Sequence, residues 1–326
     1  MSWLVLPSCF TEEEPIASLD PAEASITTYR PENGQVFYSL KEQKIVKEVS
    51  VRDWDLAFSC RPDDYSIKLN SSRGMAVFNT TSNDFYGSYQ AGDYPWQFDK
   101  ANGQKGYSGI GEWGDFSFAN PQSYGDVYLI NMGLDLNGYP TEVIKMKIRN
   151  FDSNTYNIVI GDLKGTYERQ FLIEKNDSFN YQYLSLTTEN LVSVEPPKKD
   201  WDLLFTSYVT NKKPTSSPLF FSVTNELEIT DGVLINPYQH EVSASTEIDF
   251  ADLNFFDAEG YTYNDTLDYI GRKWFDWTGW VKYFTVNEKN TYVVRDFDQN
   301  YYALQFKTFN KKTSTRYDIR FILKSL

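Results

Sequence analysis

The chain has 326 residues, a formal net charge of −14 and a pI of about 4.6, so it lacks the basic surface that nucleic-acid binding requires. Hydrophobic residues make up 41% and aromatic residues 17%, which is typical of a folded protein rich in β-sheet. With two cysteines and a single histidine, a disulfide framework and a zinc site of His and Cys ligands are excluded as main features. The sequence has no Gly-x-Ser-x-Gly nucleophile elbow, and no apolar run reaches the length of a transmembrane helix.

Residues 1–9 predict a lipid anchor. Their apolar run ends in Leu6-Pro7-Ser8-Cys9, which is typical of the end of a bacterial lipoprotein signal whose cysteine is lipidated. The run is short and has no charged start, so we expect the precursor to begin upstream; the alternative is an ordinary apolar segment. Residues 10–33 are polar and acidic, which indicates a flexible tether. Because anionic headgroups would repel an acidic body, we expect membrane attachment through this lipid only.

Residues 34–176 are expected to form a first domain of antiparallel β-strands. Alternation is clearest where Ile144, Met146 and Ile148 would share one buried face. The strands expected here cover residues 35–40, 44–50, 53–58, 65–70, 75–80, 127–132, 143–151, 156–160 and 169–174. Between residues 81 and 125 the chain is irregular and rich in Gly and aromatic residues, and a sheet scaffold commonly carries its binding site on such a segment.

One motif occurs twice. The segment Asp53-Trp54-Asp55-Leu56-Ala57-Phe58 returns as Asp200-Trp201-Asp202-Leu203-Leu204-Phe205, and each copy alternates as a half-buried strand does. The lead-in Phe37-Tyr38-Ser39-Leu40 also returns, as Tyr183-Leu184-Ser185-Leu186. A tandem duplication explains both repeats.

Residues 177–326 are therefore expected to form a second domain that begins and ends like the first. Within it, residues 247–256 are expected to form a short helix, and 291–295 to pair with 301–309 in a closing hairpin. The predicted fold is all-β, with two tandem antiparallel β-sheet domains and minor helix.

The ordered series of these segments resembles the HmuY-like haem-binding lipoproteins of Bacteroidota, over nearly the whole chain after about residue 30. The residues that carry the resemblance are Trp54–Phe58, Lys68–Asn70, Gly74–Phe78, Val127–Ile130, Trp201–Phe205, Asp231–Asn236, Thr291–Asp296 and Tyr301–Phe306. The resemblance implies an all-β fold, a lipid anchor at the outer membrane, and haem held between two axial ligands, His or in some relatives Met. The acidic run Glu12-Glu13-Glu14 is also similar to the surface-export signal of that group. This sequence departs from the family at the ligands, because Phe118 stands where the second histidine would fall and the first copy contains no histidine.

Candidate ligand-binding residues each have a structural alternative. His240 could ligate haem iron only beside an apolar slot, and otherwise is a surface-loop histidine. Met75 and Met132 lie in or at the end of strands, where thioether ligation competes with core packing. Five tryptophans could stack on a porphyrin, a glycan or a partner, or could lie in the core: Trp96, Trp113, Trp274, Trp277 and Trp280. Haem is the cofactor that the resemblance implies, and the residues themselves indicate no cofactor or metal.

Paired carboxylates offer two further hypotheses. Asp53 and Asp55 could act as the acid and base of a glycosidase, but the same pair beside the same tryptophan in the second copy favours a structural role, such as accepting hydrogen bonds from loop amides. Asp296-Phe297-Asp298-Gln299-Asn300 is similar to a calcium loop but lacks its Gly and distal Glu, so a hairpin turn is expected.

These observations favour a non-enzymatic, surface-exposed binding lipoprotein of the outer membrane, with an outer-membrane transporter as its expected partner. One alternative is a haem-free interaction subunit of an outer-membrane protein complex, which would expose large aromatic patches without a deep pocket. A minor alternative is a glycan-binding or glycan-active surface protein.

Overall fold

The computed structural model describes residues 21–29, 34–103, 108–118, 121–152, 154–213, 220–277, 284–313 and 315–326. The expected all-β fold is confirmed, because strands dominate these residues and the one α-helix among them is α1 (Phe255–Glu259). A 3-10 turn, η1 (Ser71–Arg73), joins β5 to β6 and ends at Gly74, whose φ of 66° is the left-handed conformation that glycine adopts most easily.

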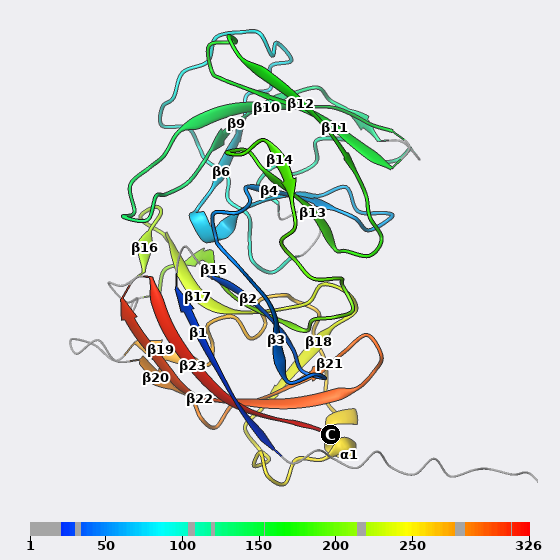
Figure 1. The fold of residues 1–326 in the computed structure, drawn as a ribbon, viewed down its shortest axis with the longest axis vertical. Coiled ribbons are helices and arrows are strands. Elements are labelled where there is room, and N and C mark those ends of the chain that lie inside the picture. The colour runs from blue at the N-terminus through cyan, green and yellow to red at the C-terminus, as the bar shows by residue number, and fades with distance from the viewer. Residues whose placement is uncertain are drawn as a thin grey trace, which may run out of the picture.

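The described strands form two β-sandwiches stacked on each other, so that four larger sheets follow one another as layers (Figure 1). Outer sheet 1 contains β6 (Ala76–Asn79), β9 (Val127–Asn131), β10 (Val143–Asp152), β11 (Thr155–Gly161) and β12 (Glu168–Glu174). Inner sheet 1 contains β4 (Leu56–Ser59), β5 (Ile67–Leu69), β13 (Tyr181–Ser185) and β14 (Asn190–Val192). Inner sheet 2 contains β2 (Gln35–Ser39), β3 (Lys44–Val49), β15 (Leu203–Asn211), β16 (Phe221–Ser222) and β17 (Leu227–Ile235). Outer sheet 2 contains β1 (Ala22–Tyr29), β18 (Glu241–Ser245), β21 (Thr291–Arg295), β22 (Tyr301–Thr313) and β23 (Arg316–Ser325).

Two small hairpins complete the described strands. They pair β7 (Gly114–Asp115) with β8 (Gln122–Ser123), and β19 (Phe275–Trp277) with β20 (Phe284–Val286).

The two outer sheets have the same strand order and the same local defects. Outer sheet 1 runs β12-β11-β10-β9-β6, and outer sheet 2 runs β1-β23-β22-β21-β18. The central hairpin of each sheet carries a bulge at the corresponding place, after Ile148 in β10 and after Phe306 in β22. The edge strands β6 and β18 each make one isolated bridge to a loop: Val77 of β6 pairs with Gln97, and Val242 of β18 pairs with Asn264. The two sandwiches are therefore related by an internal pseudo-symmetry.

The strands that precede each Asp-Trp-Asp motif, β1, β2 and β3 before the first and β12, β13 and β14 before the second, lie in the sandwich that contains the other motif. β2 pairs with β15, and β13 pairs with β4, so each lead-in hairpin completes the inner sheet that contains the other copy of the Asp-Trp-Asp motif. Likewise β1 pairs along its whole length with β23, whereas β12 pairs with β11 (Figure 1). β1, β2 and β3 thus complete the second sandwich, and β12, β13 and β14 complete the first.

Each sandwich has its own core, and a third cluster joins them. Leu56, Phe58 and Leu184 pack against outer sheet 1, and Leu203 and Phe205 pack against outer sheet 2. The third cluster lies between the two inner sheets, a region that we call the seam. Its buried members are Phe37, Val49, Trp54, Ala57, Tyr183, Val194 and Trp201. The inner sheets are therefore apolar on both faces, which explains why their strands read as nearly continuous apolar runs.

The second aspartate of each Asp-Trp-Asp motif holds an exchanged hairpin. Asp55 accepts a hydrogen bond from the Leu186 backbone N–H at 2.7 Å, and Asp202 accepts one from the Leu40 N–H at 2.6 Å. The other carboxylate oxygen of Asp55 pairs with Arg73, a buried guanidinium, and that of Asp202 lies 2.7 Å from His240 Nε2. The structural role expected for these aspartates is confirmed.

Three expectations require correction. Within the tether expected over 10–33, residues 22–29 instead form the strand β1, because its alternation buries Ile26 and Thr28 against β23; residues 10–20 and 30–33 lie outside the described residues. The boundary expected between residues 176 and 177 does not separate the sandwiches, since each contains strands from both halves of the chain. The helix expected over 247–256 is α1, and it begins only at Phe255, because Asn254 caps it by accepting hydrogen bonds from the N–H groups of residues 256 and 257.

Candidate functional site

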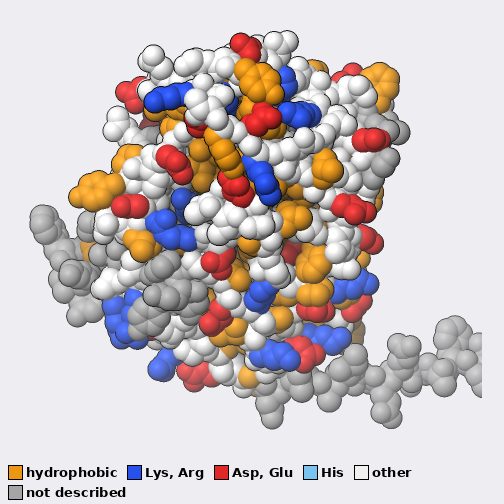
Figure 2. All heavy atoms as spheres, turned by 45° about the horizontal axis from the view of Figure 1, so that its top comes forward, with side chains coloured by type: hydrophobic (Ala, Val, Ile, Leu, Met, Phe, Trp, Pro, Cys, Tyr) orange, Lys and Arg blue, Asp and Glu red, His pale blue; other side chains and the backbone are white. Residues whose placement is uncertain are grey.

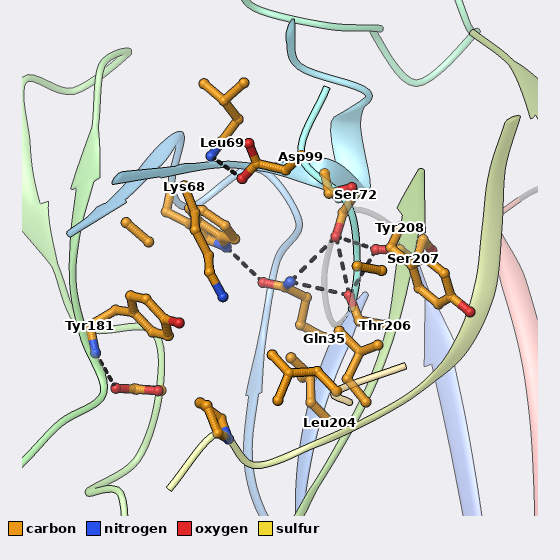
Figure 3. A pocket seen from close by; sticks show the side chains of 18 of the residues that line it. Gln35, Lys68, Leu69, Ser72, Asp99, Tyr181, Leu204, Thr206, Ser207 and Tyr208 are labelled. Atoms are coloured by element: carbon orange, nitrogen blue, oxygen red, sulfur yellow. Dashed lines mark hydrogen bonds between the residues drawn. The ribbon is translucent and has the colours of Figure 1, made fainter. Parts of the chain in front are cut away.

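A cavity of about 120 Å³ lies in the seam, where the two inner sheets face each other (Figure 3). Each sandwich contributes an equivalent aromatic pair to its wall. Trp54 packs edge-to-face on Tyr183 with ring centroids 5.0 Å apart, and Trp201 packs the same way on Phe37, also at 5.0 Å. Strand register relates these pairs, because Ala57 lies opposite Tyr183 and Leu204 lies opposite Phe37. The cavity therefore lies on the pseudo-symmetry axis.

The two halves of the cavity differ at two equivalent positions. Ala57 on β4 corresponds to the larger Leu204 on β15, and Lys68 on β5 corresponds to Leu234 on β17. The first half is therefore roomier and more polar than the second. A strictly symmetric seam would be filled by leucines at these positions, so the differences create both the space and its charge.

Hydrogen bonding also breaks the symmetry. Trp54 Nε1 donates to Gln35 Oε1 at 2.8 Å, and Gln35 Nε2 donates to the Thr206 hydroxyl at 3.1 Å. The hydroxyl of Ser72 in η1 donates to the Ser207 carbonyl at 2.7 Å and closes this end of the cavity (Figure 3). In contrast, Trp201 Nε1 is buried and has no hydrogen-bond partner among the described residues. A buried N–H without a partner is rare because it loses its hydration without compensation.

Four residues with charged side chains line the cavity: Lys68, Asp99, Lys100 and Glu195. Asp99 accepts hydrogen bonds from the N–H groups of Leu69 and Gly109, at 2.8 and 2.6 Å, yet burial raises the pKa of Asp99 to about 6. Glu195 accepts a hydrogen bond from the Tyr181 N–H at 2.8 Å, and burial raises the pKa of Glu195 to about 7. The ammonium of Lys68 lies 4.5 Å from the Tyr181 ring centroid. Burial alone would lower the pKa of Lys68, but the Tyr181 oxygen and the Asp99 carboxylate outweigh that effect and raise it, so Lys68 stays charged.

A wider polar cleft adjoins the seam cavity and shares Pro237 and Leu267 with it. Its volume is about 710 Å³, and loops of both sandwiches line it. Its charged members are Arg61, Asp63, Lys198, Glu241, Asp265 and Arg295. The cleft brings the surface close to the seam, and the loop that contains Leu267 is held to the first sandwich by a hydrogen bond from the Leu267 N–H to the Asn102 carbonyl, at 3.0 Å.

The structure does not bring the candidate ligand residues together. Met75, Met132 and Trp113 lie in the core of the first sandwich, and Trp274 lies in that of the second. His240 is 2% exposed, so it is not the surface-loop histidine expected as the alternative to a ligand. Its Nδ1 lies 2.7 Å from the Tyr238 carbonyl and its Nε2 lies 2.7 Å from Asp202, so neither nitrogen can reach an iron. These residues are packed or hydrogen-bonded for structural reasons.

The remaining candidates lie apart from the seam or beyond the described residues. Trp96 is half-buried against Tyr94, and Trp277 is half-buried against Phe284. Cys9 and Trp280 lie outside the residues that the structure describes. Phe118, at the position of the family's second histidine, is 58% exposed.

Sequence reasoning missed the residues that form the cavity, namely Gln35, Trp54, Lys68, Tyr181, Glu195 and Trp201. Two of them, Trp54 and Trp201, belong to the repeated motif. The repetition indicated that they are important, but it predicted a structural role and not a cavity. The difference between Ala57 and Leu204 within that motif was the remaining signal. The irregular segment 81–125 contributes Asp99, Lys100 and Ala101 to the cavity wall.

Within the described ranges, no group of three or more His, Cys, Asp or Glu side chains is arranged to hold a metal ion. In the same residues no helix has the length and apolar character needed to cross a membrane. The sequence Asp296–Asn300 forms a hairpin turn, as expected: Asp296 Oδ1 accepts hydrogen bonds from the N–H groups of Asp298 and Asn300, each at 2.8 Å.

Comparisons with known proteins add little. No protein-family model matches the chain, and no curated protein matches it. One solved structure that matches is the crystal structure of apo PinO from Porphyromonas gingivitis, at 11% sequence identity and a TM-score of 0.25, covering 94% of this chain and 97% of that chain. A similarity of this TM-score assigns neither a family nor a ligand.

Proposed function

We propose that this chain is a non-enzymatic binding protein of the cell surface, and that the seam cavity is its ligand site. The observation that carries the proposal is a cavity of about 120 Å³, lined mainly by aromatic and aliphatic side chains, at the junction of the two sandwiches. An enclosed apolar cavity of this volume would cost up to about 3 kcal/mol of stability if it stayed unfilled. Filling the position of Ala57 with leucine, as at Leu204, would remove most of that cost. The smaller residue therefore favours a role in binding.

The volume sets the size of the ligand. Engineered protein cavities of roughly this volume bind benzene, so we expect the seam to accept a molecule, or part of one, about the size of a single ring. A porphyrin is several times larger. Among the described residues, the methionines and the histidine that could ligate its iron are buried or hydrogen-bonded. These observations favour a small organic ligand over haem.

A cavity-filling variant tests the proposal. Toluene would be titrated into the wild-type protein and into Ala57→Leu, with binding followed by calorimetry and by the fluorescence of the seam tryptophans. We expect saturable binding to the wild type and at least a tenfold loss in Ala57→Leu. The matched variant Leu204→Ala enlarges the seam from the equivalent position and should also accept naphthalene. Absence of toluene binding to both wild type and Leu204→Ala would overturn the proposal.

Surface anchoring is a second part of the proposal. It is supported by Leu6-Pro7-Ser8-Cys9 and by the acidic residues that follow. Palmitate labelling of cells that express the wild type or Cys9→Ala tests it, and equal labelling of the two would contradict it. An outer-membrane transporter remains the partner that we propose, to be sought by cross-linking at the surface of those cells.

The role of a haem-free interaction subunit has less support. Large aromatic side chains are exposed at Tyr86, Tyr139 and Phe256. However, hydrophobic side chains on the face that Figure 2 shows are scattered among charged ones and do not gather in one patch. Extensive protein interfaces usually require a contiguous apolar area, so this face does not favour that alternative.

A further inference from the structure

We propose that the seam cavity recognises a ring-sized organic acid, whose carboxylate accepts hydrogen bonds from Trp201 Nε1 and from the Lys68 ammonium. This inference rests on the proposed function and assigns the chemical class of its ligand. The apolar part of the acid would lie among the aromatic pairs of the seam.

The pseudo-symmetry shows what Trp201 lacks. In the first half, Trp54 Nε1 donates to Gln35 Oε1. The register of β2 with β15 and of β13 with β4 places Tyr181 at the position equivalent to Gln35. The Tyr181 hydroxyl does not replace that acceptor: Trp201 is 3% exposed, and its Nε1–H has no hydrogen-bond partner among the described residues. An acceptor atom of a ligand would serve Trp201 as Gln35 serves Trp54.

A charged donor also lines the cavity. Lys68 reaches into the seam next to Tyr181, and the two side chains and Gln35 point toward one another (Figure 3). The equivalent position in the second half is Leu234, so the ammonium is specific to this half. An ammonium and an unpartnered indole N–H that line one cavity favour an oxygen acceptor that carries negative charge.

The carboxylates of the cavity are already engaged by the protein. Asp99 accepts hydrogen bonds from two backbone N–H groups, and Glu195 accepts one from the Tyr181 N–H and another from the Asn180 side chain. Their oxygens are therefore directed toward the backbone that they hold. Trp201 Nε1 and the Lys68 ammonium are both donors, so they favour a ligand group that accepts hydrogen bonds over an amine.

A set of probes that share one ring and differ in the polar group tests the inference. Phenylacetate, toluene and 2-phenylethylamine would be titrated by calorimetry into the wild-type protein near pH 7. A charge-assisted hydrogen bond corresponds to a difference of about tenfold or more in affinity, so we expect phenylacetate to bind at least that much more tightly than toluene. We expect 2-phenylethylamine to bind most weakly.

Matched variants identify the donors. Trp201→Phe and Trp54→Phe enlarge the cavity similarly, but only Trp201→Phe removes the unpartnered N–H, so only it should lose the preference for phenylacetate. Lys68→Leu, which introduces the residue of the equivalent position, should lose that preference while still binding toluene. Melting curves confirm that each variant folds, and the comparison of probes on the wild type stands even if a variant does not.

The outcomes separate the two proposals. Equal binding of phenylacetate and toluene, or tighter binding of the amine, overturns this inference and leaves the proposed function in place. No binding of any probe overturns the proposed function itself. A preference for phenylacetate that Trp201→Phe and Lys68→Leu both retain also overturns the inference, since the donors would then lie elsewhere.

Discussion

Replacing the second aspartate of each repeated motif should weaken the exchange of hairpins, and the two copies should respond unequally. In Asp55→Asn, an amide would face Arg73, whose guanidinium is 7% exposed and cannot lose its charge. Leaving such a buried charge unpaired costs about 3–5 kcal/mol. In Asp202→Asn the partner is His240, and a neutral imidazole can still hydrogen-bond to an amide. We expect that substitution to cost about 1–2 kcal/mol.

Urea unfolding followed by circular dichroism would measure these free energies. The matched controls are Asp53→Asn and Asp200→Asn, because both first aspartates are exposed, and we expect changes within about 0.5 kcal/mol for each. Amide exchange locates the effect: in Asp55→Asn the Leu186 N–H should exchange faster while the Leu40 N–H stays protected. If Asp55→Asn costs no more than Asp53→Asn, the aspartate does not hold the exchanged hairpin and the reasoning fails.

Three further predictions concern pH, the N-terminal strand and the seam. Because burial raises the pKa of Glu195 to about 7 from 4.5, the folded protein holds a proton there that the unfolded chain has lost, and stability should fall as pH rises from about 4.5 to 7. Glu195→Gln should make the free energy of unfolding less dependent on pH, by up to about 3 kcal/mol over that range. An unchanged pH dependence in urea titrations from pH 5 to 8 would contradict the assignment. Ile26→Ala should lower the free energy of unfolding by about 2–4 kcal/mol. A chain that starts at residue 34 should melt at a lower temperature than one that starts at residue 21, and equal melting temperatures would show that residues 22–29 do not stabilise the fold. Ala57→Leu should stabilise the protein by about 1–2 kcal/mol, and marked destabilisation in the same assay would show that the seam has no room for a larger side chain.

Local features of the fold could be predicted from the sequence because they depend on neighbouring residues. Alternation in 143–151 placed β10, and the repeated motif placed β4 and β15. The same alternation was present at Ala24, Ile26 and Thr28, but the acidic residues before it led to the prediction of a tether. The acidic composition was therefore given more weight than the alternation, although the alternation is what determines which side chains pack against β23.

The exchange of hairpins could not be predicted in this way. β2 would pair equally well with β4 of its own half or with β15, because the two motifs have nearly the same residues. Only the three-dimensional arrangement distinguishes these pairings. The seam cavity follows from the exchange, since it is formed where Trp54 and Trp201 meet hairpins from the opposite half. Sequence reasoning therefore identified the residues of the motif but not the site that they form.

The most direct test of the seam as a ligand site observes the Trp201 N–H itself. The chain has eight tryptophans, and ¹⁵N-resolved NMR separates their indole N–H signals, which Trp201→Phe and Trp54→Phe would assign. On addition of phenylacetate, the Trp201 signal should move downfield in a saturable way as the N–H gains an acceptor, while the Trp54 signal, already hydrogen-bonded to Gln35, should move much less. A Trp201 signal that does not respond to saturating phenylacetate would contradict the account.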